Sequence, residues 1–200
     1  MALIRTVAGP LRHEIDKIKA SRFIASIWPV TETDEVAPHL DACRDAFRDA
    51  NHHGFAWRLS GADRMRYSDD GEPSGTAGRP ILQEIDGRNL VDVLVVVSRI
   101  FGGTRLGTGG LVRAYGGAAA EALDLADIVE RAEVLVLVAQ FGYGVTGPVQ
   151  SVLAAFELNP ERSDYGERVE LELAVPIEQE AAVRTALIDA THGSIRFREP

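Results

Sequence analysis

Residues 67–82 read YSDDGEPSGTAGRPIL, and residues 97–115 read VSRIFGGTRLGTGGLVRAY. Eleven of the 19 glycines in this 200-residue chain lie between Gly71 and Gly117. Glycine is needed where the backbone takes a positive φ or approaches another group closely. The first stretch carries an acidic run and the second carries only arginine charges. The two stretches therefore predict a surface site and not merely a requirement of the fold.

The second stretch predicts an anion site, with phosphate as the favoured anion. Its charges and its loop glycines are Arg99, Arg105 and Arg113, with Gly102, Gly103, Gly107, Gly109 and Gly110. We expect a helix to begin near Gly110 or Leu111, and a helix N-terminus, exposed N–H groups and arginines together suit an anion. The alternative is a tight connection whose glycines only allow turning. The stretch is not a P-loop, because Thr108 stands where that motif requires lysine.

The first stretch allows three interpretations. Its polar members are Asp69, Asp70, Glu72, Ser74 and Thr76. Carboxylate oxygens could hold Mg²⁺ or Ca²⁺, or could support acid–base chemistry. The aspartates could instead bond their own backbone in a turn. A third interpretation pairs the acids with the three arginines across a cleft. We expect no metal and no cofactor.

Two adjacent histidines precede a predicted strand over residues 54–60. Only one of them can face inward, because side chains alternate along a strand. His52 could carry a proton or contact phosphate; alternatively it is a half-buried histidine bonded to a neighbouring loop. Ser74, His52 and Asp70 could be written as a hydrolytic set, but no GxSxG elbow supports it.

These motifs closely resemble the signature of the YigZ/IMPACT family of uncharacterised and translation-linked proteins. The matching elements are DDGEPSGTAG, FGG and LVRAY, with KASRFIA upstream from Lys19 and His52 at the family histidine. The resemblance covers about the whole chain. Ile100 stands where the family usually has tyrosine, so one hydroxyl is missing from the expected site.

Residues 1–126 are expected to form the first of two domains. Their elements are predicted as strand 19–30, helix 33–49, strand 54–60, an extended piece at 64–67, helix 76–85 broken by Pro80, strand 91–98 and helix 111–126. Strand 91–98 is almost continuously apolar, which indicates a central strand buried on both faces.

Residues 127–200 are expected to form the second domain. The predicted order is strand 131–140, helix 146–158, strand 161–165, strand 168–175, helix 177–190 and strand 194–198. This β-α-β-β-α-β order is ferredoxin-like. The resemblance implies the same α+β organisation: a first domain like the second domain of ribosomal protein S5, and a second like domain V of elongation factor G.

Charge is unevenly distributed along the chain. Of the net −9, residues 1–126 hold 15 Lys/Arg and 17 Asp/Glu, and residues 127–200 hold 6 and 13. The second domain is therefore a poor partner for a polyanion. A single cysteine, Cys43, excludes an internal disulfide. No secretory signal or membrane-length apolar run is present, which indicates a cytoplasmic protein without a membrane partner.

Three classes of function remain open at this stage. The resemblance to a bacterial two-domain member favours a non-enzymatic binding protein linked to translation or its regulation. Such a protein would contact RNA, the ribosome, another phosphate-bearing ligand or a protein partner. The second class is an enzyme acting on a phosphorylated or nucleotide substrate between the two motif loops. The third is a purely structural interaction module. The oligomeric state is not encoded in any pattern we find.

Overall fold

The computed structural model describes residues 3–61 and 64–198. They divide into two compact units, one from Ile4 to Arg131 and the other from Ala132 onward together with Leu3. Both units combine helices with sheets, which confirms the α+β class. The independent folding of two domains that meet near Asp127 stays a prediction.

A five-stranded antiparallel sheet lies at the centre of the first unit, in the order β2-β3-β6-β4-β5. Its strands are β2 (Leu11–Glu14), β3 (Arg22–Pro29), β4 (His52–Arg58), β5 (Met65–Ser68) and β6 (Val93–Ile100). The apolar β6 is the middle strand, and only its last residue is not fully buried, which confirms the expectation for this run. A separate pair joins β1 (Leu3–Val7) to β7 (Ile128–Ala132).

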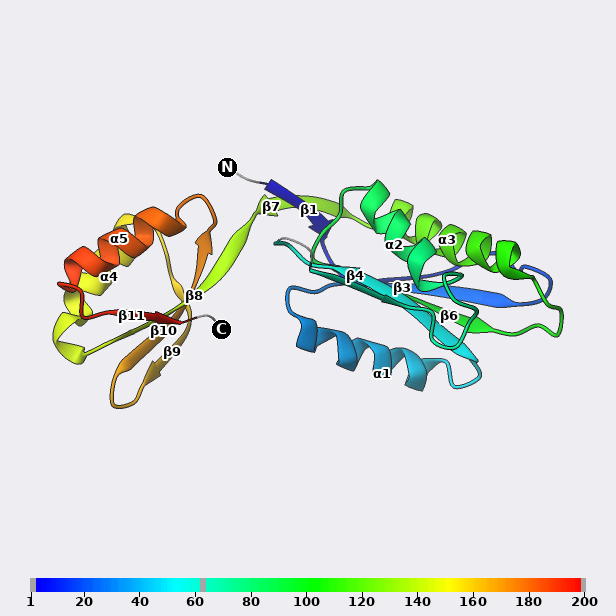
Figure 1. Ribbon diagram of the computed structural model, residues 1–200, viewed down its shortest axis with the longest axis horizontal. Helices are drawn as coiled ribbons and strands as arrows, with labels where there is room; N and C mark the ends of the chain where they lie inside the picture. The colour runs from blue at the N-terminus through cyan, green and yellow to red at the C-terminus, as the bar shows by residue number, and fades with distance from the viewer. Residues whose placement is uncertain (1–2, 62–63, 199–200) are drawn as a thin grey trace. The chain divides into compact units, whose positions relative to one another are not determined.

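Helices cover both faces of this sheet (Figure 1). They are α1 (Val36–Ala46), preceded by the short 3-10 helix η1 (Thr33–Glu35), then α2 (Gly78–Gly87) and α3 (Thr108–Leu125). The alternation of β6 divides the core between the two faces. Val95 and Val97 pack with α2 and α3, whereas Leu94 and Val96 pack with α1.

Several boundaries differ from the sequence-based expectation. Helix α2 is continuous and is not broken by Pro80, because this proline lies in the first turn, where its missing N–H has no helical partner to lose. Strand β3 begins at Arg22 and not at Lys19, since Lys19 and Ala20 take positive φ values of 47° and 65°. Helix α3 begins at Thr108, before the expected start. The short strands β1, β2 and β7 were not expected.

The second unit has the predicted ferredoxin-like order. Its elements are β8 (Val134–Phe141), η2 (Tyr143–Val145), α4 (Thr146–Ala155), β9 (Pro160–Tyr165), β10 (Val169–Pro176), α5 (Glu180–Ala190) and β11 (Arg196–Arg198). The antiparallel sheet runs β11-β8-β10-β9. On β10 the inward positions are apolar and the outward positions include Glu170 and Glu172, so one face packs on α4 and α5.

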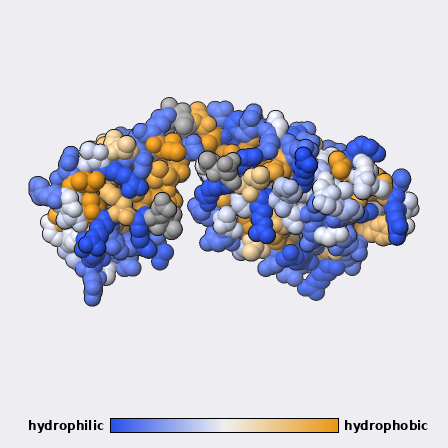
Figure 2. Space-filling model, in the orientation of Figure 1, coloured by the Kyte–Doolittle hydropathy of each residue, from blue (hydrophilic) through white to orange (hydrophobic). Residues whose placement is uncertain are grey.

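The face seen in Figure 2 is mostly hydrophilic, with hydrophobic side chains in small groups. In the described ranges, no helix combines the length and the apolar character needed to cross a membrane.

Candidate functional site

Asp69 organises the acidic loop through its carboxylate. Its two oxygens accept hydrogen bonds from the backbone N–H groups of Gly75 at 2.8 Å and of Ala77 and Gly78 at 2.9 Å. Burial raises the pKa of Asp69, but these backbone N–H donors outweigh burial and hold the pKa below its ordinary value. The carboxylate therefore closes the loop and satisfies the first N–H groups of α2, as in the turn interpretation, and is not presented to a metal.

Asp70 connects the same loop to the two histidines. Its carboxylate accepts a 2.6 Å hydrogen bond from the backbone N–H of His53, and its carbonyl oxygen lies 2.8 Å from Nδ1 of His52. A carbonyl can only accept, so Nδ1 of His52 carries the proton. His52 is thus bonded to the neighbouring loop, with Nε2 left without a partner among the described residues. Because Asp70 meets His52 through its backbone, the set of Ser74, His52 and Asp70 is not assembled as a hydrolytic triad.

The third acid of the loop, Glu72, lies in a buried ion pair. Its Oε1 accepts hydrogen bonds from Nη1 of Arg99 at 2.7 Å and from the hydroxyl of Tyr115 at 2.8 Å. Burial, reinforced by the charge of Glu72, raises the pKa of Tyr115 far above its ordinary value, so the phenol stays protonated as a donor. One acid of the first stretch therefore does pair with one arginine of the second. The contact locks the acidic loop to β6 and α3.

Arg99 is held on several sides. Its guanidinium carbon lies 5.6 Å from the ring centre of Phe23 and 5.4 Å from that of Phe101. Its Nε is buried and has no hydrogen-bond acceptor within the part of the chain that the structure describes. Buried polar groups are nearly always bonded, so this N–H is an exception among the buried side-chain atoms of the described residues.

The glycine-rich loop between β6 and α3 places the N-terminus of α3 close to Arg99 and Glu72. Gly107 precedes the helix with φ 73°, and no side chain caps it. Leu111 makes the first helical bond, from its N–H to the carbonyl of Gly107. The N–H groups of the first turn therefore have no intrahelical acceptor, and they carry the positive end of an 18-residue helix.

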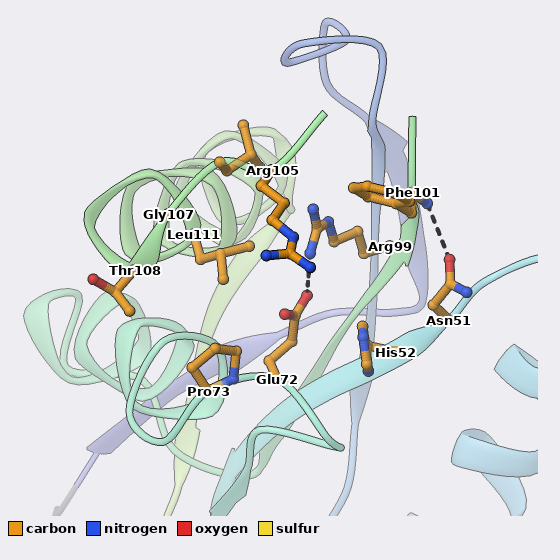
Figure 3. A pocket seen from close by; sticks show the side chains of 11 residues that line it. Asn51, His52, Glu72, Pro73, Arg99, Phe101, Arg105, Gly107, Thr108 and Leu111 are labelled. Atoms are coloured by element: carbon orange, nitrogen blue, oxygen red, sulfur yellow. Dashed lines mark hydrogen bonds and ion pairs between the residues drawn. The ribbon is translucent and has the colours of Figure 1, made fainter. Parts of the chain in front are cut away.

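These parts surround one cavity of about 490 Å³ (Figure 3). Its lining is Asn51, His52, Glu72, Pro73, Arg99, Phe101, Arg105, Leu106, Gly107, Thr108 and Leu111. The guanidinium groups of Arg99 and Arg105 both turn toward the middle of the cavity, near Glu72. The two motif stretches thus face each other across one space.

Only some of the expected site residues line this cavity. They are His52, Glu72, Arg99, Arg105 and Gly107. The expected residues outside the lining are Asp69, Asp70, Ser74, Thr76, Gly102, Gly103, Gly109, Gly110 and Arg113. Thr76 bonds the carbonyl of Pro73 at 2.6 Å, and Gly102 packs on the backbone of Ala20. These two residues therefore shape the loops.

Sequence reasoning missed the polar and aromatic lining residues Asn51, Phe101 and Thr108. Asn51 adjoins His52, and its Oδ1 accepts a 3.2 Å hydrogen bond from the N–H of Phe101. The ring of Phe101 is 44% exposed. Phe101 could have been predicted as a site residue, because it stands next to a pair of glycines and close to Arg99 in the sequence. Among the described residues, no three His, Cys, Asp or Glu side chains gather as a metal site.

Two family models match the chain in sequence. The Impact N-terminal domain matches residues 19–123, and the domain of unknown function DUF1949 matches residues 140–194. The first model spans both motif stretches and every residue that lines the cavity.

Curated relatives match over most of their length. The IMPACT family member YigZ of Escherichia coli is 32% identical over 92% of this chain and 91% of its own length. YvyE of Bacillus subtilis is 33% identical over 97% and 89%, and a relative from Thermus thermophilus is 38% identical over 89% and 97%. The crystal structure of a hypothetical protein superposes with a TM-score of 0.75 at 30% identity, covering 100% of this chain and 98% of that one.

Proposed function

Because this chain belongs to the IMPACT family, we propose that it is a non-enzymatic binding protein linked to translation or its regulation. It contacts RNA, alone or in the ribosome, or another phosphate-bearing ligand, through the cavity between the two motif loops. The observation that carries the proposal is the open N-terminus of α3 beside Arg99 and Arg105.

The charges of the lining support an anionic ligand. Two arginines face one carboxylate, and that carboxylate, Glu72, already accepts two hydrogen bonds. Arg105 is exposed and makes no ion pair with any described residue, so its charge is available to a ligand. The N-terminus of α3 adds about half a positive charge. The second unit, from Ala132 onward, is acidic, so a polyanion would favour the first.

An enzyme acting on a phosphorylated or nucleotide substrate ranks second. The observation that favours it is His52, whose Nδ1 is fixed by Asp70 and whose Nε2 is left able to accept a proton. Against it, the other carboxylates of the acidic loop are bonded to backbone N–H groups and offer no second acid or base. If the protein converted a bound ligand into a chemically different product, the enzyme hypothesis would become the favoured one.

The salt dependence of RNA affinity tests the proposal. Each lost phosphate contact should flatten the log–log slope of affinity against salt by about one unit. We expect Arg105→Ala to do so for ribosomal RNA. Arg48→Ala is the matched control, because this arginine is 82% exposed and lies outside the cavity. Equal slopes for wild type and Arg105→Ala, or RNA binding that the second unit reproduces alone, would contradict the proposal.

A further inference from the structure

The cavity has two chemically different ends. At one end lie Arg105, Thr108 and Leu111, at the beginning of α3; at the other lie Asn51, His52 and Phe101 (Figure 3). The first end offers cationic and N–H donors. The second offers an aromatic ring and neutral polar groups. A ligand that fills the space must therefore combine an anion with an aromatic, hydroxyl-bearing or amide-bearing body.

The anion end has an unmet donor besides the helix N-terminus. The side chain of Arg99 is only 7% exposed, yet its Nε has no acceptor among the described residues. Its Nη1 is already used by Glu72. The fixed guanidinium lies between the two ends, close to the ring of Phe101, and its Nε–H is buried and has no acceptor among the described residues. An acceptor oxygen would reach this N–H only if the guanidinium or the ring of Phe101 shifted when a ligand bound.

The other end has two polar atoms without a partner among the described residues and one aromatic ring that is partly exposed. Asn51 accepts through Oδ1, so its amide NH₂ remains a free donor. His52 donates through Nδ1, so in its neutral form Nε2 is an acceptor suited to a hydroxyl group. The partly exposed ring of Phe101 offers a surface on which a base can stack. An acceptor for a hydroxyl, a donor for a carbonyl or ring nitrogen, and a stacking surface together match a nucleoside.

We propose that the cavity binds a terminal nucleotide, with its phosphomonoester at the N-terminus of α3 and its base against Phe101. This deepens, and rests on, the proposed function. A phosphomonoester presents three free oxygens and more than one negative charge at neutral pH, whereas an internal phosphodiester presents two oxygens and one charge. The helix N–H groups and Arg105, with the buried guanidinium of Arg99 in the wall beside them, form a cationic cluster of donors suited to the former. The cavity volume lies in the range of small-molecule sites.

Calorimetric titration of the full chain tests the ligand class. The probes are 5′- and 3′-adenosine monophosphate, adenosine, inorganic phosphate, and a short single-stranded oligoadenylate with and without a terminal phosphate. We expect the monophosphates or the phosphorylated oligomers to bind about tenfold or more tightly than their unphosphorylated forms. Binding of the free monophosphate alone identifies a free nucleotide as the source, and binding of both identifies a chain end as well; either result supports the proposal.

Two variants separate the ends of the site. Arg105→Ala should weaken only the phosphorylated probes, and Phe101→Leu should weaken nucleotides by roughly tenfold while leaving inorganic phosphate unchanged. Arg48→Ala should change neither, and unchanged melting temperatures should show that the variants are folded.

Three outcomes would overturn the inference. Phosphorylated and unphosphorylated oligomers could bind equally while Arg105→Ala still flattens the salt slope; the proposed function would then stand without the terminal nucleotide. Inorganic phosphate could bind as tightly as the monophosphates, which would show that the base and its contact with Phe101 contribute nothing to affinity. Absence of binding by every probe and by ribosomal RNA would end both proposals.

Discussion

At the scale of single residues, Gly102 is fixed by a contact and not by its backbone angle. A Cβ placed there would lie 2.1 Å from the carbonyl carbon of Ala20, and the Gly102 N–H also bonds the hydroxyl of Ser21. The loop that follows β6 is therefore held at Gly102 against the turn that precedes β3. Phe101 and Arg105 follow β6 on either side of this contact, whereas Arg99 is placed by its pairing in β6 with Phe23 and His52.

We expect Gly102→Ala to destabilise the protein by about 1–3 kcal/mol, the usual effect of forcing an atom into packed structure. Gly117→Ala is the matched control, because nothing lies within 4 Å of its Cβ position and it is inside α3. That change should be neutral or stabilising by up to about 1 kcal/mol, since alanine favours helix. Urea unfolding of both variants measures the difference, and an equal effect of the two would refute the steric account.

His53 should make stability depend on pH. Its Nδ1 lies 2.8 Å from the hydroxyl of Ser98, and burial lowers its pKa, against the opposing charge of Asp70. Below about pH 6.5 the unfolded chain takes up a proton that the folded state resists, so the free energy of unfolding falls on acidification. The slope contributed by one histidine is at most about 1.4 kcal/mol per pH unit.

Comparison of His53→Asn with wild type by urea unfolding at several pH values isolates this effect. The variant should lose less stability than wild type as the pH falls from about 7.5 to 5.5, since asparagine cannot take up the proton. Parallel curves for the two proteins would show that His53 is not the responsible group.

At the scale of elements, the start of α3 decides which of its side chains face the cavity. Thr108 and Leu111 line the cavity. Arg113 does not line the cavity, but its Nη1 reaches back to within 3.7 Å of the Cβ position at Gly109, in the first turn of α3. The expected helix start near Gly110 or Leu111 would have left Arg113 in the first turn, beside the anion. With the actual start at Thr108, Arg113 lies in the second turn of α3 and outside the cavity lining, although its guanidinium lies beside the first turn.

Thr108→Pro should weaken binding of a phosphate-bearing ligand without loss of stability. Thr108 is the first residue of α3, where proline is tolerated because the N–H has no helical acceptor. The change removes one N–H from the cavity and keeps the helix. We expect affinity to fall by roughly ten- to a hundredfold, the value of one hydrogen bond to a charged group, with the melting temperature unchanged. Thr108→Ala, which keeps the N–H, should bind like wild type unless the hydroxyl is the true contact.

Helices and strands could be predicted where the residue pattern along the element sets its structure. They could not be predicted where pairing with a distant segment sets it. The apolar β6 and the β-α-β-β-α-β order could be read directly, because burial sets residue type along each element. Strands β1 and β2 are short edge or paired segments with mixed polarity, and only their partners define them. In the site, an acid–arginine pair was one expectation among three. The sequence did not show that Glu72 and Arg99 form this pair, or that Tyr115 bonds Glu72, because both contacts depend on the packing of α3 beside β6.

At the scale of the whole molecule, two compact units with separate cores predict two folding units. The apolar cluster of the second unit contains Leu137, Leu171 and Val183 and draws every member from residues 135–197. A fragment of residues 132–200 should therefore melt cooperatively on its own. Circular dichroism during thermal unfolding measures this. A fragment without a transition would show that the second unit needs the first.

The first and last strands of the first unit, β1 and β7, pair with each other, so the chain enters and leaves this unit at neighbouring points. The N–H of Ala8 bonds the carbonyl of Asp127 at 2.8 Å, so the end of β1 lies beside the start of β7, and Ile4 and Arg131 lie together at the opposite end. A module that is entered and left at neighbouring points can be spliced into a surface loop of an unrelated host with little distortion of either. The cavity could then be moved with the module: residues 4–131, grafted as an insert, would report binding at the proposed site through whatever signal the host provides.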